Sequence, residues 1–411
     1  MTGKVRSDCL EKHKRKCYNN LCCPGNKVMS MKKRYLIFPT VCILAALLLE
    51  GLSIYKTEFT VFYTERIFGK ITVPLAALNG LLPFSAGEIL LCLAVLILAT
   101  ALLLGIGMLL VKIFVRGFRF PLLYRKYLLF IYYIAGIYLL IMVLNCFILY
   151  QYPPMQRQGA VTEERTRLLT ELRDTVVVKA NELAELMERD ESGYVKVPPR
   201  KVLERESKEA MQRLSQNGYP RLSGYYPDFK YFNNSAFFSQ QYMTGYYFPF
   251  SMEANINELM YGMNIPYSVC HELSHLKGYI REDEANFIAY LACIESEDMY
   301  FKYSALLGVL GYLDNDFYRA VGKDINIYQK HPAISDRVRR DCVFLTEETW
   351  RKVNEKSLLD TETVKKASNT FTEGILKSNG VSEGMKSYSN VVSLLLDYYA
   401  SFDNDDNVGT K

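Results

Sequence analysis

Three long runs of apolar residues dominate the first part of the chain. They cover residues 35–55, 89–111 and 127–150, and each is flanked by charged residues. A helix needs roughly 20 apolar residues to cross the hydrocarbon core of a membrane, and buried helices of soluble proteins rarely run this long without a polar face. The pattern therefore predicts three N-terminal transmembrane helices.

After two prolines at positions 153 and 154 the pattern changes. Residues 162–189 carry an apolar stripe at helical spacing among charged residues, which predicts an amphipathic helix. A second helix is expected from Pro198-Pro199 to about Gly218, because proline suits the first turn of a helix.

Residues 225–266 are rich in aromatic residues, glycine, asparagine and proline, which favours a small sheet or extended segments. From Tyr267 to about Ala400 the pattern is helical again. The fold class that we predict is mainly α, with three transmembrane helices followed by a helical domain that contains a small β or extended region.

The charge is divided unequally along the chain. Residues 1–150 hold 18 Lys+Arg and 6 Asp+Glu, a net of +12, whereas residues 151–411 hold 31 and 38, a net of −7. The basic residues flank the apolar runs instead of forming one basic surface. Nucleic acid is therefore not expected as a partner.

The Lys/Arg bias of the short flanks predicts the orientation in the membrane. Ten Lys+Arg precede the first run, the connection over 56–88 has three Lys+Arg and three acids, and that over 112–126 has five Lys+Arg and no acid. We expect a multi-pass protein of the plasma membrane whose N-terminus is cytoplasmic. Residues 31–150 would form the membrane domain and 151–411 an extracytoplasmic domain.

Residues 1–30 are expected to be a basic tail. Met31 precedes two lysines, an arginine and the first apolar run, as at the start of a signal anchor, so we expect translation to begin at Met29 or Met31. Four of the ten cysteines lie in this tail, and a metal site there is the weaker alternative because nothing follows Cys22-Cys23 at ligand spacing. Three cysteines in the domain are too few and odd in number for a disulfide scaffold.

His271-Glu272-Leu273-Ser274-His275 has the HExxH pattern. On a helix, positions i and i+4 share a face, so both imidazoles can bind one Zn²⁺ while Glu272 reaches the metal-bound water as general base. The chain has only four histidines, and chance produces this pattern in roughly one such chain in 500. The motif predicts a zinc metallopeptidase.

A third zinc ligand is expected shortly after the motif. Gly278 can end the helix, and a second helical pattern follows it. Glu282 lies seven residues after His275, and Asp283 and Glu284 compete with it for the ligand role. Acidic residues in a first helical turn also interact favourably with the helix dipole, and we expect at least one of the three to do only that.

These motifs resemble those of thermolysin-like and HtpX-type membrane peptidases, which pair HExxH with Glu-x-x-x-Asp on a second helix. Glu282 and Asn286 match that spacing, with asparagine in place of aspartate. The resemblance implies a zincin-like, gluzincin domain in which Glu282 ligates zinc and Asn286 supports a ligating histidine. Without a charge, that support would be weaker.

His331-Pro332, followed by Arg337, resembles the His-Pro-x4-Arg segment of HtpX-type and prenyl-protease domains. The resemblance implies a site role for His331. The alternative is a histidine held by packing at a helix start. Arg337 either orients the substrate or braces the site.

The chain also resembles a bacterial membrane family of unknown function, the domain of unknown function 3810, over about residues 31–400. The stretches that carry this resemblance are residues 245–250, 253–257, 270–272, 281–286 and 387–392. The resemblance implies a shared fold and leaves the substrate open.

In the predicted mechanism, His271, His275 and Glu282 hold zinc, and Glu272 deprotonates a water that attacks a peptide carbonyl. The developing oxyanion needs a further donor. The candidates are His331, Tyr388 and Arg337.

Residues 246–257 either pair with an extended substrate as an added strand or form core sheet. Cys270 is expected to point away from the metal face and to be an ordinary buried cysteine. The main hypothesis is a zinc metallopeptidase that is anchored in the lipid bilayer and acts on peptide or protein substrates outside the cell membrane. The alternative is a non-catalytic membrane sensor or assembly protein with a zinc-binding domain, but a pure binding site has no need of a base at Glu272.

Overall fold

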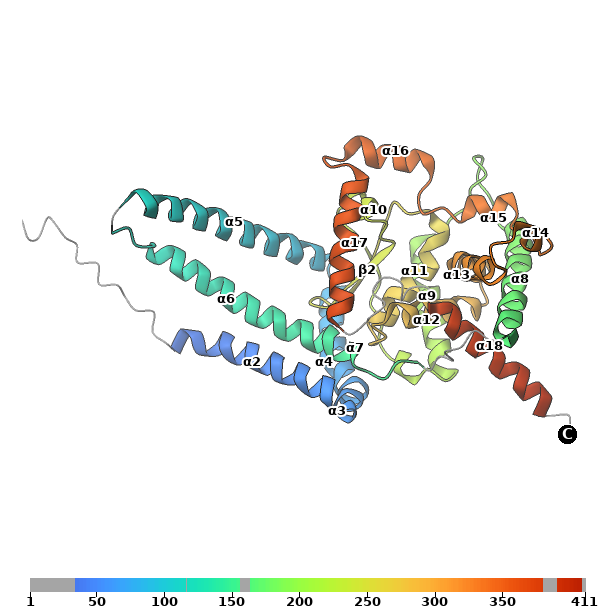
Figure 1. Ribbon diagram of the computed structural model, residues 1–411, viewed down its shortest axis with the longest axis horizontal. Coiled ribbons are helices and arrows are strands. Elements are labelled where there is room, and N and C mark those ends of the chain that lie inside the picture. The colour runs from blue at the N-terminus through green and yellow to red at the C-terminus, as the bar shows by residue number, and fades with distance from the viewer. Residues whose placement is uncertain (1–33, 116, 156–162, 380–389, 409–411) are drawn as a thin grey trace, which may run out of the picture.

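The computed structural model describes residues 34–115, 117–155, 163–379 and 390–408. Figure 1 shows three long helices at one end of the molecule and a helical domain with a small sheet at the other. The first part consists of α2 (Arg34–Tyr55), α3 (Thr57–Phe62), the π-helical turn η1 (Tyr63–Phe68), α4 (Gly69–Gly80), α5 (Ala86–Phe114), α6 (Leu122–Met142), the π-helical turn η2 (Val143–Phe147) and α7 (Ile148–Tyr150).

The domain follows, and the mainly helical class expected from the sequence is confirmed. Its elements are α8 (Glu163–Leu186), α9 (Arg200–Gln216), η3 (Pro220–Leu222), β1 (Lys230–Tyr231), α10 (Ser235–Gln240), β2 (Gly245–Phe248), β3 (Glu253–Ile256), η4 (Gly262–Asn264), α11 (Ile265–His275), α12 (Glu282–Ile294), α13 (Met299–Ala320), α14 (Ile325–Tyr328), α15 (Asp336–Asp341), α16 (Glu347–Lys356), α17 (Thr361–Ser378) and α18 (Val391–Val408).

Three helices are long and apolar enough to cross a membrane, namely Arg34–Tyr55, Ala86–Phe114 and Leu122–Tyr150. They contain the three apolar runs of the sequence. None of the most apolar part of α5 is buried, and so large an exposed apolar surface is rare on soluble proteins. In contrast, α2 and α6 pack tightly, since a Cβ at Gly136 would come within 2.9 Å of the Pro39 carbonyl oxygen.

The connection between α2 and α5 is helical, where the sequence suggested only a loop of balanced charge. Helices η1 and α4 bury Tyr63, Phe68 and Thr72. Asn79, near the end of α4, donates a hydrogen bond from Nδ2 to the carbonyl of Ser251 at 2.6 Å. This segment is stabilised by the domain, which local sequence spacing does not reveal.

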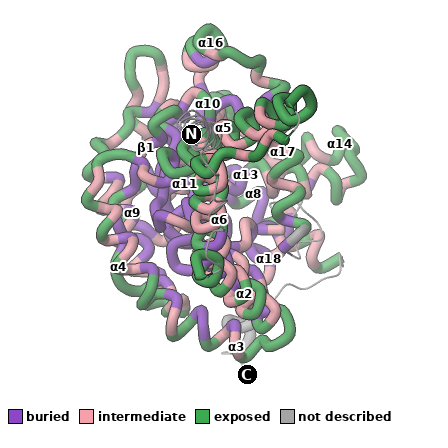
Figure 2. The backbone as a smooth tube through the Cα atoms, turned by 90° about the vertical axis from the view of Figure 1, so that its left-hand side faces the viewer, coloured by how far each residue is buried: buried purple, intermediate pink, exposed green. Residues whose placement is uncertain are grey.

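Helices α11 and α12 form the centre of the domain. Figure 2 shows buried backbone gathered around α11, with exposed helices outside it. Residues 283–293 of α12 are all buried. Helix α8 packs along α13, and α8 and α9 correspond to the two helices expected after the last apolar run.

The sheet has three strands in the order β1-β3-β2. Strand β1 is parallel to β3 and β2 is antiparallel to it. All three lie in the aromatic-rich region for which the sequence favoured a small sheet. Helix α11 packs against β2 and β3, and β3 is buried at every position.

Two carboxylates fasten the sheet to the start of α5. Glu253 in β3 forms a buried ion pair with Lys230 and accepts a hydrogen bond from the amide of Gly87 at 2.6 Å. Glu88 accepts hydrogen bonds from the amides of Asn233 at 2.6 Å and Asn234 at 2.9 Å. A negative charge is favourable beside a helix N-terminus, so Glu253 also stabilises the first turn of α5.

The π-helical turn η2 fastens the end of the third long helix to the domain. A π-helical turn changes the regular backbone pairing, and two carbonyls of this turn accept hydrogen bonds from side chains. The carbonyl of Leu144 accepts from the Tyr63 hydroxyl at 2.9 Å, and that of Asn145 from the Tyr247 hydroxyl at 3.0 Å. Asn145 also donates from Nδ2 to the carbonyl of Pro249 at 2.6 Å.

Candidate metal centre

The HExxH motif lies on α11, and the acidic residues that follow it begin α12. Helix α11 ends at His275, and Gly278 reverses the chain with a φ of 85°, an angle that strains other residues. The returning chain places the carbonyl oxygen of Tyr279 2.7 Å from Nδ1 of His275. Helix α12 then starts at Glu282, so its first turn lies beside the histidines.

Three potential ligand atoms face one another. Nε2 of His271 lies 3.1 Å from Nε2 of His275 and 3.2 Å from Oε2 of Glu282. Nε2 of His275 lies 3.8 Å from the same oxygen. With zinc–ligand bonds of about 2.0–2.1 Å, tetrahedral ligand atoms are about 3.3 Å apart, so the observed distances fit one ion held by all three.

The partners of the opposite ring nitrogens fix the tautomer of both neutral imidazoles. A carbonyl oxygen can only accept, so Nδ1 of His275 donates to Tyr279. Nδ1 of His271 lies 2.9 Å from Oδ1 of Asn286 and donates to it in the same way. In the neutral imidazoles both Nε2 atoms therefore carry their lone pairs toward each other and toward Glu282. Without a metal, a proton on Nε2 of His271 can donate to Glu282, and a divalent cation bound there would take the place of that proton.

Burial and neighbouring charges separate the pKa values of the two histidines. Burial, reinforced by His271, lowers the pKa of His275 to about 4. Burial also disfavours the charged form of His271, but the hydrogen bond to Glu282 and the charges of Glu272 and Glu282 outweigh it and raise the pKa. His275 is thus neutral, and able to bind a metal, throughout the neutral pH range.

Glu272 lies between this cluster and strand β2. Its side chain is almost completely buried, and the Tyr247 amide donates a hydrogen bond to it. A Cβ at Gly245 would lie 2.6 Å from its Oε1. Burial raises the pKa of Glu272 to about 8, with His271 opposing the shift and Glu282 adding to it. A carboxylate with this pKa accepts a proton near neutral pH much more readily than an ordinary one.

Glu282 is the acidic residue that joins the histidines, and its competitors lie elsewhere. Within the described ranges, the group able to hold a metal is His271, His275 and Glu282, with ligand atoms within 4.8 Å of one another. Glu284 instead accepts a hydrogen bond from the amide of Met155 at 2.9 Å. Its buried carboxyl ties α12 to the chain that leaves the third long helix.

Comparison with known proteins identifies the family. The family model described as protein of unknown function DUF3810 matches residues 63–396. The chain belongs to the DUF3810 family. No curated protein and no solved structure matches the chain. The match includes β2, α11 and α12, so the candidate metal centre lies within the family region. The relation to zinc peptidases stays a prediction.

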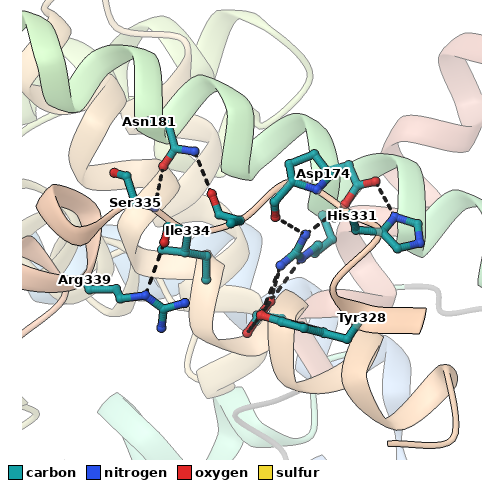
Figure 3. A network of polar contacts seen from close by, with 11 residues as sticks. Asp174, Asn181, Tyr328, His331, Ile334, Ser335 and Arg339 are labelled. Carbon is teal, nitrogen blue, oxygen red and sulfur yellow. Dashed lines mark hydrogen bonds and ion pairs between the residues drawn. The ribbon is translucent and has the colours of Figure 1, made fainter. Parts of the chain in front are cut away.

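In this DUF3810 protein, two of the residues predicted for the site have other partners, and Figure 3 shows His331 beside Asp174. Nδ1 of His331 lies 2.7 Å from Oδ2 of Asp174 on α8, and its ring packs against Phe317 at 4.8 Å. Arg337 pairs with Glu185, also on α8, at 2.7 Å. Neither is seen to contact a ligand of the cluster in the described part of the chain. His331 therefore contacts α8 and α13, and Arg337 contacts α8; a role for either residue at the metal stays a prediction.

The third predicted oxyanion donor, Tyr388, lies outside the described residues. Sequence reasoning missed two neighbours of the cluster, Gly245 and the carbonyl of Tyr279. Gly245 had a visible signal, since it is the one position without a side chain before a run of bulky aromatic residues. Cys270 is buried, as expected, and its Sγ lies 3.6 Å from Sγ of Cys293.

Proposed function

We propose that the protein is a membrane-anchored, zinc-dependent peptidase. One observation carries the proposal: two imidazole lone pairs and a Glu282 oxygen converge at zinc-ligand spacing beside the buried carboxyl of Glu272. Two nitrogen ligands and one carboxylate are typical of catalytic zinc sites, whereas structural sites are closed by four protein ligands.

Zinc, when bound, supplies a Lewis acid for hydrolysis. The chain supplies the proton transfers. Glu272 would take a proton from the attacking water and pass it to the leaving amine, because it is the buried carboxyl beside the three ligand atoms. Asn286 and the Tyr279 carbonyl hold the two imidazoles in the tautomer that leaves Nε2 free for the metal.

An extended peptide is the form of substrate that the site favours. Strand β2 forms one side of the sheet, and Glu272 lies beside it. Residues 244 and 257 are bonded across the ladder, with Asn257 donating to Thr244. The backbone groups of Gly245 and Tyr247 therefore point away from β3. The Tyr247 amide binds Glu272, which leaves the groups of Gly245 and the Tyr247 carbonyl for a substrate that adds as a strand.

The three long apolar helices serve as the membrane anchor in this proposal. The basic flanks at 1–34 and 112–126 place the N-terminus in the cytoplasm and the domain on the outer side of the plasma membrane. The peptidase then acts on peptides or proteins outside the cytoplasm.

The test is zinc content and peptide hydrolysis of the purified full-length protein. We expect about one zinc per chain, loss of zinc and activity in His271→Ala, and loss of activity alone in Glu272→Gln. His331→Ala is the matched control and should keep both, because its partner is Asp174. A wild-type chain that holds no zinc contradicts the proposal. A zinc-loaded chain whose cellular role survives Glu272→Gln points instead to the non-catalytic sensor.

A further inference from the structure

Strand β2 connects the candidate metal centre to the long apolar helices. At its first residue, Gly245, it touches Glu272. At its last, Phe248, it lies so close to Gly87 of α5 that no Cβ fits there. The turn after it continues to Phe250, whose ring packs on Tyr138 of α6 at 5.3 Å. Both helices direct their domain ends toward the sheet (Figure 1).

The position of Tyr138 shows how deep this turn reaches. The third apolar helix runs to Tyr150, and at 1.5 Å per residue Tyr138 lies about 18 Å below that end along the helix. Asn145, which holds Pro249, lies about 7.5 Å below it. The residues of this helix after Tyr138 are increasingly buried by the domain, with Ile148, Leu149 and Tyr150 almost fully covered, and Phe248 lies at the first turn of α5. The turn after β2 is therefore at the level where the exposed apolar part of the helices begins.

The start of α12, which carries the candidate ligand Glu282, is also bonded to the end of the third apolar helix. Arg281, the residue before Glu282, donates a hydrogen bond to the carbonyl of Tyr150 at 2.6 Å. The metal centre is thus held between the last residue of one apolar helix and a strand that descends to another. A chain that lies beside Gly245 is then only about 10 Å, or three extended residues, from the level of Phe248, where α5 begins.

The length of β2 gives the number of substrate residues between the candidate metal centre and the apolar helices. An extended chain rises about 3.3 Å per residue. A substrate paired along β2 reaches the level of Phe248 three residues from Gly245, after about 10 Å, and that of Phe250 after at most about 17 Å. A soluble polar chain would bring its charged residues to the hydrocarbon there, which costs up to roughly 2.5–3.5 kcal/mol for each at mid-membrane depth. A chain that emerges from its own membrane span incurs no such cost.

We infer that the protein cleaves membrane-anchored polypeptides at bonds about three to six residues from the end of their membrane span, on the side of the domain. This inference rests on the proposed peptidase function. Strand β2 sets the distance: it directs one side of the substrate into the bilayer while the bond to be cut lies beside Glu272.

The first test measures where model substrates are cut. Full-length protein is reconstituted in phosphatidylcholine–phosphatidylglycerol vesicles with substrates in which one cleavable segment follows a membrane span directly or after a rigid (EAAAK)₄ helix of about 30 Å. We expect cuts three to six residues from the span and at least tenfold slower cleavage after the rigid spacer. The same segment as a soluble peptide is the control.

The outcomes separate the inference from the proposed function. Equal rates for the soluble, direct and spaced substrates overturn the inference and leave the peptidase intact. Absence of zinc-dependent cleavage of all three overturns the proposed function, and the inference with it.

A second test needs no activity and measures the depth of the turn after β2. The chain has one tryptophan, Trp350, so Trp350→Phe with Phe250→Trp gives a single probe at the turn. Brominated phosphatidylcholine should quench its fluorescence at least twice as strongly as that of the matched control, Trp350→Phe with Tyr318→Trp. The control residue lies near the end of α13, beside α14 on the far side of the domain (Figure 1). Equal quenching of the two probes overturns the inference.

Discussion

Replacing Glu272 by glutamine tests the electrostatics of the site without removing a proposed ligand. Glutamine keeps the volume beside Gly245 and can accept the same hydrogen bond from the Tyr247 amide. It cannot ionise. In the metal-free protein the variant therefore isolates the free energy that depends on the buried carboxyl of Glu272.

The change in the free energy of unfolding with pH follows from the pKa of Glu272, which is about 8 in the folded protein and about 4.3 in an unfolded chain. Between these values the folded state holds a proton that the unfolded chain has released. The stabilisation from this proton is complete below about pH 4.3 and is lost as the pH rises to 8. At about 1.4 kcal/mol per pH unit, wild type loses roughly 4 kcal/mol relative to the variant between pH 5 and 8.

Thermal unfolding of chelator-treated, full-length protein from pH 5 to 8 measures this difference. A domain of this size changes its Tm by roughly 2–4 °C per kcal/mol. The difference in Tm between Glu272→Gln and wild type should therefore shift by about 10 °C in favour of the variant from pH 5 to pH 8. Once zinc is restored, its activity should be lower by about 10²–10⁴-fold. Parallel Tm curves for the two proteins would refute the reasoning, because they would mean that Glu272 is ionised in the folded metal-free site.

Three further changes test the surroundings of the cluster. Asn286→Leu should weaken zinc binding 10- to 100-fold and Asn286→Asp should strengthen it, as chelator competition will show; equal affinities would contradict the role of the Nδ1 hydrogen bond. Gly245→Ala should lower kcat at unchanged zinc content, because its methyl group would meet Glu272 Oε1 at 2.6 Å, whereas Gly311→Ala, with nothing within 4 Å, is the control; equal kcat values would count against the contact. Zinc affinity should fall on acidification from above pH 6.5, because the raised pKa of His271 lets protons compete early; a flat affinity down to pH 6 would disprove this.

Much of the architecture could be predicted from local patterns. The apolar runs gave the three long helices, and the stripe over 162–189 gave α8, because helical periodicity is a local property. The second apolar run begins at Ile89, directly after the charged Glu88. The structure begins the helix at Ala86, since the amides of Asn233 and Asn234 solvate the Glu88 carboxylate. That contact joins residues far apart in the sequence.

The candidate site was predictable only where spacing on one helix decides the geometry. His271 and His275 share a helical face by their separation alone, whereas the choice of Glu282 over Glu284 depended on how Gly278 turns the chain. His331 shows the converse. Its motif suggested a role at the metal, but in the structure its ring bonds to Asp174, 157 residues earlier in the chain. A carboxylate on a distant helix leaves no trace beside His331 in the sequence.

The π-helical turn η2 accommodates one residue more than the same length of regular α-helix, so deleting one residue would restore regular helical pairing and leave α7 nearly unrotated. The Leu144 and Asn145 carbonyls would then be displaced from Tyr63 and Tyr247, whose hydroxyl groups they bind. Exchanging one apolar residue of η2 for another changes only local packing. We therefore expect relatives to differ freely in the apolar residues of 143–147 but to keep Asn145 and the length of the turn, so that gaps in an alignment of the family avoid it.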